Sequence, residues 1–180
     1  MSDFRSKLEV RPAVECDAVA IRALMERSIE ALQVGFLTAE QIKASHDAMG
    51  LDTQLIADAT YFCVFDGDTL VGCGGWSFRA TLYGGNHTQG RNGRVLDPAT
   101  ERARIRAMYT HPGHTKRGIG RLVLAAAEAA AAEAGFNALE MAATLAGEPF
   151  YLKCGYEVES RWIDTNGEVD IPLLTMVKTL

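Results

Sequence analysis

An alanine-rich run, Leu122–Ala134, limits the fold of this chain more than any other segment, and the chain enters it through the glycine-spaced turn Thr115–Arg121. Alanine is the strongest helix former, and Glu128 and Glu133 supply the polar positions of a partly exposed helix. The first amide N–H groups of a helix have no intrahelical partners, and with the helix dipole they attract anions. The turn therefore predicts either a site for a phosphate or pyrophosphate, or a loop that only shapes the start of a structural helix.

The residue types in the turn favour the anion site. Gly118 and Gly120 allow a phosphate to approach the backbone, because no Cβ atom intervenes. Lys116, Arg117 and Arg121 add positive charge beside the free amides. The inference from these residues is phosphate or pyrophosphate binding.

Two common nucleotide-binding motifs do not match. A P-loop needs Lys and Ser or Thr after Gly-x4-Gly; Gly113–Gly118 has the first half, but Ile119–Gly120 replaces the required pair. A dinucleotide fingerprint needs a third glycine where Val123 stands, and the glycines of Gly72–Gly74 meet Ser77 in the third place. Nucleotide hydrolysis and Rossmann-type binding are therefore disfavoured.

Length and composition indicate one domain spanning residues 1–180. A chain of 180 residues with 48% hydrophobic residues can bury one sizeable core, and no Pro/Gly/Ser-rich linker divides it. The formal net charge of −5 argues against a general nucleic-acid binder.

Met1–Val10 lacks the apolar core of a signal peptide, and no apolar stretch could span a bilayer, so we expect a cytoplasmic protein with no membrane partner. The four cysteines lack CxxC spacing and partnered histidines, which predicts reduced thiols, no disulfide and no metal site.

Hydrophobic periodicity and turn residues predict the order strand, two helices, two strands, long loop, strand, helix, strand, helix, strand. Thr38 with Gln41 forms a capping box that opens a helix, and Asp66–Asp68 is the turn of a β-hairpin. The predicted strands are Leu8–Arg11, Tyr61–Phe65, Leu70–Phe78, Arg102–Thr110, Ala138–Thr144 and Ile171–Lys178; helices follow Pro12–Ala18, cover Ala39–Met49, start at Asp52, and cover Leu122–Ala134 and Glu148–Lys153.

A polar, glycine-spotted segment, residues 79–101, is too long for an ordinary connection. Substrate-recognising residues concentrate in loops on a fixed scaffold, so we expect this segment to be a substrate-side insertion. In the strand that follows, Arg102, Arg104 and Arg106 share one face. That face could attract an acidic substrate or the phosphates of a bound cofactor, or it is solvated or covered by a helix.

Two motifs give the chain a family resemblance. In the first, Ala107–Pro112 ends a strand and reaches a proline, and Thr115–Gly120 then leads into a helix. In the second, Phe150–Tyr156 places an aromatic-Tyr pair four residues before a Gly-aromatic pair. With this spacing the chain resembles the GNAT superfamily of acetyl-CoA-dependent N-acetyltransferases over nearly all of its length. Two residues depart from the family pattern, since Thr115 stands where Gln or Arg is usual and Thr144 where Asn is frequent.

The resemblance implies an α+β fold, a mixed α/β sandwich. Its central sheet would be mixed and mostly antiparallel, with helices on both faces. Two splayed parallel strands, Arg104–Thr110 and Ala138–Thr144, would form the cleft for acetyl-CoA, whose amide-rich arm pairs like an added strand with Met108 and Thr110. The cofactor-binding residues implied are Met108, Tyr109, Thr110, Thr115, Lys116, Arg117, Gly118, Ile119, Gly120 and Arg121.

The same resemblance implies acetyl transfer to a primary amine by direct attack in a ternary complex. Tyr151 matches the family's general acid, which protonates the departing thiolate. Met108 matches a backbone donor to the developing oxyanion. The general base is open among Glu140, on a strand beside the expected cleft, and Glu101 and His87, at or near the long loop.

Several alternatives stay open at this stage. A non-catalytic acyl-CoA-binding sensor or interaction module is the main one, because Thr115 and Thr144 depart from the family pattern. A longer acyl-CoA donor is another. The sequence does not identify the amine acceptor or the oligomeric state, although an exposed edge at the closing strand, Ile171–Lys178, would permit a homodimer.

Overall fold

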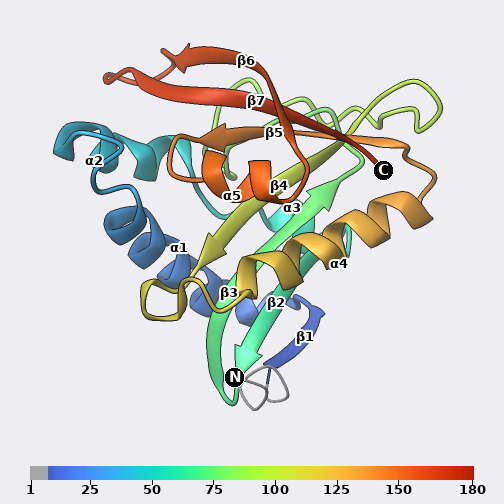
Figure 1. The fold of residues 1–180 in the computed structure, drawn as a ribbon, viewed down its shortest axis with the longest axis horizontal. Helices are drawn as coiled ribbons and strands as arrows, with labels where there is room; N and C mark the ends of the chain where they lie inside the picture. The colour runs from blue at the N-terminus through green and yellow to red at the C-terminus, as the bar shows by residue number, and fades with distance from the viewer. Residues whose placement is uncertain (1–7) are drawn as a thin grey trace.

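The computed structural model of the protein describes residues 8–180 and contains one seven-stranded sheet (Figure 1). Its strand order is β1-β2-β3-β4-β5-β7-β6, and β4 with β5 is the parallel pair among otherwise antiparallel neighbours. Residues 1–7, and with them most of the stretch examined for a signal peptide, lie outside the described residues. The strands are β1 Leu8–Pro12, β2 Tyr61–Asp66, β3 Thr69–Ser77, β4 Ala103–Thr110, β5 Ala138–Thr144, β6 Glu157–Asp164 and β7 Ile171–Thr179.

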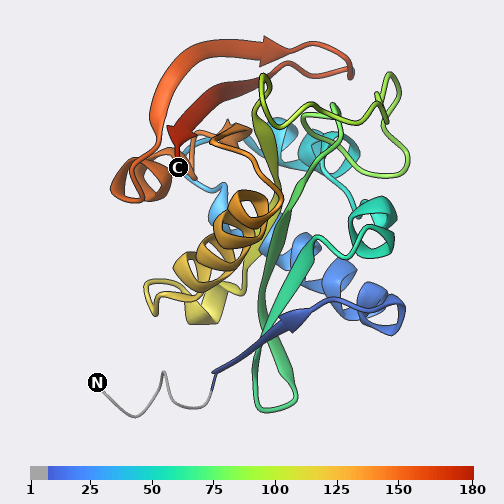
Figure 2. The same ribbon diagram turned by 90° about the vertical axis from the view of Figure 1, so that its right-hand side faces the viewer.

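Helices cover both faces of the sheet (Figure 2), which confirms the predicted fold class. On one face, Ile21, Leu24 and Met25 pack with the β2–β3 hairpin. On the other, Leu124 and Ala127 pack with side chains of β4, β5 and β7. In residues 8–180 no helix is long and apolar enough to cross a membrane. The α-helices are α1 Ala18–Leu32, α2 Ala39–Ala48, α3 Thr53–Ala57, α4 Ile119–Glu133 and α5 Glu148–Lys153.

Local signals place most of these elements where the sequence predicts them. At the start of α2 the Thr38 hydroxyl accepts from the Gln41 amide at 3.2 Å, and the Gln41 side chain accepts from the Thr38 amide at 3.0 Å. Asp52 caps α3 by accepting from the amide of Gln54 at 3.1 Å. Because each cap is satisfied within one turn, the sequence alone locates the helix starts.

The prediction missed β6, and this changes the edge of the sheet. β6 pairs with β7 on the side away from β5, so the closing strand β7 is internal and not an edge. Most side chains of β6 are exposed or half-buried, because it is an edge strand and rests on one neighbour. The alternation of apolar and polar residues is weak, because Ser160 stands at the alternating position between Val158 and Trp162, and Ile163 is exposed. Any dimer formed by strand pairing would use β1 or β6.

The long loop, residues 79–101, is tied to the end of the β3–β4 pair. Ala80 N–H donates to Arg94 O at 2.9 Å, and Leu96 N–H donates to Phe78 O at 2.8 Å. Leu96 is buried in the core that also contains Trp76. The two ends of the loop are therefore held together by these hydrogen bonds. Residues 82–84 line the cleft that is described in the next subsection.

Candidate functional site

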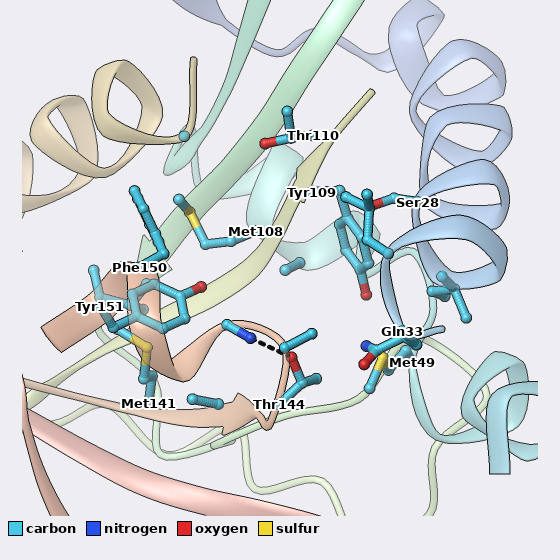
Figure 3. Close-up of a pocket in the computed structure, with 18 of the residues that line it drawn as sticks. Ser28, Gln33, Met49, Met108, Tyr109, Thr110, Met141, Thr144, Phe150 and Tyr151 are labelled. Carbon is cyan, nitrogen blue, oxygen red and sulfur yellow. Dashed lines mark hydrogen bonds between the residues drawn. The ribbon is translucent and has the colours of Figure 1, made fainter. Parts of the chain in front are cut away.

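A cleft of about 740 Å³ opens where β4 and β5 separate (Figure 3). The two strands pair only at Ala103 with Leu139 and at Arg104 with Glu140, and beyond those positions they diverge. The edge of β4 from Ile105 onward therefore has no strand partner on the β5 side in the described chain. This confirms the splayed parallel pair predicted from the sequence, and it leaves backbone groups available to an extended ligand.

At one end of the cleft, which we call the turn end, the segment 114–121 leads into α4. Gly118 caps the helix in a left-handed conformation with φ 82°, and Lys116 also has a positive φ of 60°. The helix begins at Ile119, three residues before the predicted start, so its first free amides belong to the glycine turn itself. A Cβ atom on Gly120 would lie 3.2 Å from Phe150 Cζ, so a larger residue there would need the Phe150 ring to shift by a few tenths of an ångström.

A bulge in β4 shapes the middle of the cleft. Ala107 has a positive φ of 51°, and the register with β3 shifts between Cys73 and Gly75. The buried phenol of Tyr61 donates to Ala107 O at 2.7 Å, and this hydrogen bond stabilises the distorted backbone of β4. The bulge turns Met108 toward the α4 side of the sheet, where it packs against the core.

Tyr151, on α5, forms the wall opposite β4, and its phenol points into the cleft (Figure 3). The side chain is buried, and this burial raises the pKa of its phenol above the ordinary value. Gly147 makes room for the ring, because a Cβ atom there would lie 2.8 Å from Tyr151 Cε2. Thr144 Oγ1 accepts from Gly147 N–H at 3.2 Å, so this departure from the family pattern supports the turn that precedes α5.

A second tyrosine, Tyr109, lines the facing wall. Its phenol points toward Gln33 and Met49 (Figure 3), and burial raises its pKa as well. Both phenols therefore stay protonated through the physiological pH range, so each can donate a proton or a hydrogen bond.

The end of the cleft away from the turn, which we call the loop end, is formed by Ser28–Gln33, Ala48–Gly50, Leu82–Gly84 and β7. Arg106 holds the loop portion in place. Its guanidinium donates to Thr81 O at 2.9 Å and to Gly84 O at 2.8 Å, and it pairs with Asp52 at 3.0 Å. The position of residues 81–84 at this end of the cleft therefore depends on Arg106 and its buried ion pair with Asp52.

The structure brings most of the predicted cofactor residues together. Arg117 alone among them does not line the cleft, and the remaining nine do: Met108, Tyr109, Thr110, Thr115, Lys116, Gly118, Ile119, Gly120 and Arg121. Tyr151 lines the same cleft. The predicted general acid and the predicted cofactor segment thus share one cavity.

None of the three candidate bases lines this cleft. The Glu140 carboxylate is paired with Arg104 and lies 3.5 Å from Arg102 Nη1. Glu101 is paired with Arg94, which lowers the pKa of its carboxyl to about 2. His87 Nε2 lies 2.5 Å from Asp47 O, on the outer side of Gly50. Each group is engaged elsewhere in the described part of the chain.

The predicted arginine face, formed by β4 and the residue before it, binds protein groups. Arg102 pairs with Glu159 at 2.8 Å, Arg104 pairs with Glu140, and Arg106 is buried against Asp52. None of them belongs to the turn end, so this face does not contribute the charge expected beside a pyrophosphate.

Two residues of the loop end, Gln33 and Met49, were not singled out as site residues, and Arg106, which also lines the cleft, was named only as part of the arginine face. Gln33 and Met49 end helical segments far from the motifs in sequence, and no local pattern distinguishes them. Arg106 could have been recognised as structural, because an arginine between apolar residues of a central strand needs a buried acidic partner. Among residues 8–180 no three His, Cys, Asp or Glu side chains gather as a metal site.

Comparison with known proteins gives one consistent result. Residues 22–156 match the model of the family described as "Acetyltransferase (GNAT) family". One curated relative is an uncharacterised N-acetyltransferase, YjcF of Bacillus subtilis (strain 168). It is 25% identical over 163 residues, which cover 88% of this chain and 99% of the relative.

Solved structures share the fold. A GCN5-related N-acetyltransferase from Rhodopseudomonas palustris superposes with a TM-score of 0.71 at 21% identity, covering 96% of this chain and 95% of the other. The PaiA N-acetyltransferase of Thermoplasma acidophilum, in complex with coenzyme A, gives 0.65 at 17% identity over 96% and 99%. YncA of Salmonella typhimurium, with its cofactor acetyl-CoA, gives 0.64 at 15% identity over 96% and 94%.

Proposed function

Because this chain belongs to the GNAT acetyltransferase family, we propose that it transfers the acetyl group of acetyl-CoA to a primary amine by direct attack in a ternary complex. The observation that carries the proposal is the composition of one cleft. A helix N-terminus with basic neighbours lies at one end of it, an unpaired strand edge runs along it, and a buried phenol faces that edge.

The cofactor fits along β4. Its pyrophosphate would be held by the free amides of Ile119–Arg121, with Lys116 and Arg121 as counter-charges. The pantetheine arm would pair with the open edge of β4 at Met108 and Thr110. Structures of the same fold from Thermoplasma acidophilum and Salmonella typhimurium hold coenzyme A and acetyl-CoA, which supports this placement.

The reaction needs a neutral amine, because only the free base has a lone pair for the thioester carbonyl. Attack forms the C–N bond and breaks the C–S bond. The developing oxyanion would accept from the Met108 amide at the bulge, and the departing thiolate would take the phenolic proton of Tyr151. The amine releases its extra proton, and Tyr151 regains one from solvent, so the protein returns to its starting state.

An alkylamine with a pKa of about 10.4 is only about 0.04% neutral at pH 7. The cleft favours the neutral form by its own composition. Burial disfavours an ammonium ion, and no Asp or Glu of residues 8–180 lines the cavity to stabilise one. We therefore assign no enzyme base. The amine enters as the free base, or loses its proton to water as it is desolvated.

The test is thermal unfolding with and without acetyl-CoA, with ATP and NAD as controls. A ligand at 100 times its Kd stabilises the fold by about 2.7 kcal/mol, which raises Tm by a few degrees. Stabilisation by acetyl-CoA alone supports the cofactor site, and thiol release with amines then tests turnover. Stabilisation without turnover of any amine would indicate a non-catalytic acyl-CoA-binding module. No stabilisation at saturating acetyl-CoA would contradict the proposal.

A further inference from the structure

Gln33, at the loop end of the cleft, carries a buried acceptor atom that the protein does not use. It caps the C-terminus of α1, where its backbone carbonyl accepts from the amides of Phe36 and Leu37 at 3.1 Å each. The residue is only 6% exposed, and its Oε1 has no hydrogen-bond partner among the described residues. The side chain nevertheless lines the cleft, beside Met49 and below the phenol of Tyr109 (Figure 3).

A buried amide oxygen without a donor is costly unless a ligand supplies one. Folding fixes the position of Gln33, because its own backbone carbonyl anchors the turn after α1. The open acceptor therefore indicates a place for an N–H group of a ligand in the cleft.

The charges around this place exclude a second ionic group on that ligand. In the described chain no carboxylate lines the cleft that could pair with another ammonium. The Lys and Arg side chains in the lining are Lys116, before α4, Arg121, in the first turn of α4, and Lys153, on α5, together with Arg106. Arg106 is already bonded to Asp52 and to two loop carbonyls, so it offers nothing to an anionic substituent.

The remaining surface of the loop end is mostly apolar. Side chains from α1, the segment after α2, the long loop and β7 meet there. A neutral hydrocarbon or aromatic body gains free energy by displacing water from such walls, whereas a charged one loses hydration without a partner. The apolar side chains concerned are Ile29, Leu32, Met49, Leu82, Ile171 and Leu173.

We infer that the loop end selects a primary amine carried on an uncharged, apolar body, and that Gln33 Oε1 accepts a hydrogen bond from the amine N–H. The inference rests on the proposed acetyl transfer and names its acceptor class. Amines with a second ammonium group, and amino acids with a carboxylate, are the classes that this cleft disfavours.

Three probes of equal length test the charge preference: 1-aminohexane, 1,6-diaminohexane and 6-aminohexanoate. Thiol release from acetyl-CoA is followed, and thermal stabilisation by acetyl-CoA is measured on the same samples. We expect kcat/KM for 1-aminohexane to exceed that of either charged probe by about tenfold or more, since a tenfold ratio needs only 1.4 kcal/mol. Equal rates, or a preference for a charged probe, would overturn the inference. Inactivity of all three probes, while acetyl-CoA still stabilises the fold, would also overturn the inference. If acetyl-CoA does not stabilise the fold, the result contradicts the proposed function instead.

Two substitutions test Gln33 itself. Gln33→Met keeps the volume and removes the acceptor, so KM for 1-aminohexane should rise about fivefold to tenfold with kcat nearly unchanged. Gln33→Glu keeps the shape and places a negative charge beside the reacting amine, which favours the unreactive ammonium ion, so kcat/KM at neutral pH should fall by a similar factor, about tenfold, for all three probes. Gln41→Met is the matched control, because Gln41 bonds Thr38 and Asp170 outside the cleft.

Wild-type KM values in Gln33→Met would show that Oε1 does not contact the amine. Wild-type rates with all three probes in Gln33→Glu would show that the side chain at position 33 does not lie beside the reacting amine. Either result removes Gln33 from acceptor selection, and acetyl-CoA stabilisation of both variants shows that each is folded.

Discussion

At the scale of single residues, the cleft contains two phenols on opposite walls, that of Tyr151, which is buried, and that of Tyr109, which is half-buried. Desolvation raises the pKa of both. We expect Tyr151→Phe to lower kcat by about 10²- to 10⁴-fold, the usual contribution of a general acid, with acetyl-CoA stabilisation intact. Thiol release and thermal unfolding measure the two effects separately.

Tyr109→Phe is the control for that substitution, because it removes the same hydroxyl from the other wall. A much smaller change in kcat is expected. If Tyr109→Phe abolishes turnover and Tyr151→Phe does not, the proton donor is the tyrosine of β4 and the assignment to α5 fails.

Glu140 provides a second test at this scale. Its carboxylate is bound to Arg104 outside the cleft, so Glu140→Gln should leave the dependence of kcat/KM on pH unchanged. That dependence should follow deprotonation of the amine and rise toward its solution pKa. The lining groups that titrate or carry charge are Tyr83, Arg106, Tyr109, His114, Lys116, Arg121, Tyr151 and Lys153. Loss of an acid limb near neutral pH in Glu140→Gln would restore Glu140 as the base.

Gly118 tests the helix N-terminus. Its φ of 82° suits glycine, and an alanine there would cost about 1–2 kcal/mol of stability. We expect Gly118→Ala to weaken acetyl-CoA stabilisation, because the strained turn moves the free amides. Gly67→Ala is the control, since Gly67 has φ 59° in the β2–β3 turn, far from the cleft. Equal loss of acetyl-CoA binding in both variants would indicate a general effect of instability.

At the scale of elements, Arg106 connects β4 to the long loop and to the start of α3. Asp52 also pairs with Arg91 at 2.6 Å, so removing Arg106 leaves its charge compensated and orphans mainly the two loop carbonyls. We expect Arg106→Met to lower the free energy of unfolding in urea by about 1–3 kcal/mol, the cost of buried acceptors left without donors, and to raise KM for the amine. Arg161→Met, which breaks the exposed pair with Glu148, should cost less than about 1 kcal/mol. Similar losses in both variants would show that the buried pair contributes no special support.

The elements that the sequence predicted correctly are those whose interacting residues lie close together in the chain. The turn before α4 and the cap of α2 depend on residues within one helical turn, so their patterns are local. The contact of Arg106 with Asp52 spans 54 residues, and nothing local identifies its partner. Gln33 was missed for the same reason, because its proposed role depends on its position relative to β4 and the long loop, which are distant from it in the sequence. β6 was missed for a different reason, because its half-buried face carries too few apolar residues to give a clear alternating pattern.

At the scale of the whole molecule, buried phenols and thiols make stability sensitive to alkaline pH. Burial raises the pKa of each group in the folded protein, and raises that of Cys63 to about 12. Above about pH 9 the unfolded chain releases these protons first, so it binds fewer protons than the folded chain and the free energy of unfolding falls as pH rises. The groups are Tyr61, Cys63, Cys73, Tyr109, Tyr151 and Tyr156.

Urea unfolding between pH 8 and 10.5 measures this loss. Each such group contributes up to about 1.4 kcal/mol per pH unit, so Cys63→Ala should make the slope shallower by that amount between about pH 8.5 and 10.5. A slope identical to that of the wild type would mean that the Cys63 thiol ionises equally in both states.

The two ends of the cleft are built from different parts of the molecule, and this separation has an evolutionary consequence. The proposed donor side belongs to β4 and the start of α4, whose geometry the sheet itself imposes. The proposed acceptor side is assembled from chain segments that end or connect elements: Gln33, Met49 and Leu82–Gly84. On this proposal, a duplicated gene can come to encode an enzyme for a different amine when a few residues of those segments change, while the residues of the donor side stay the same.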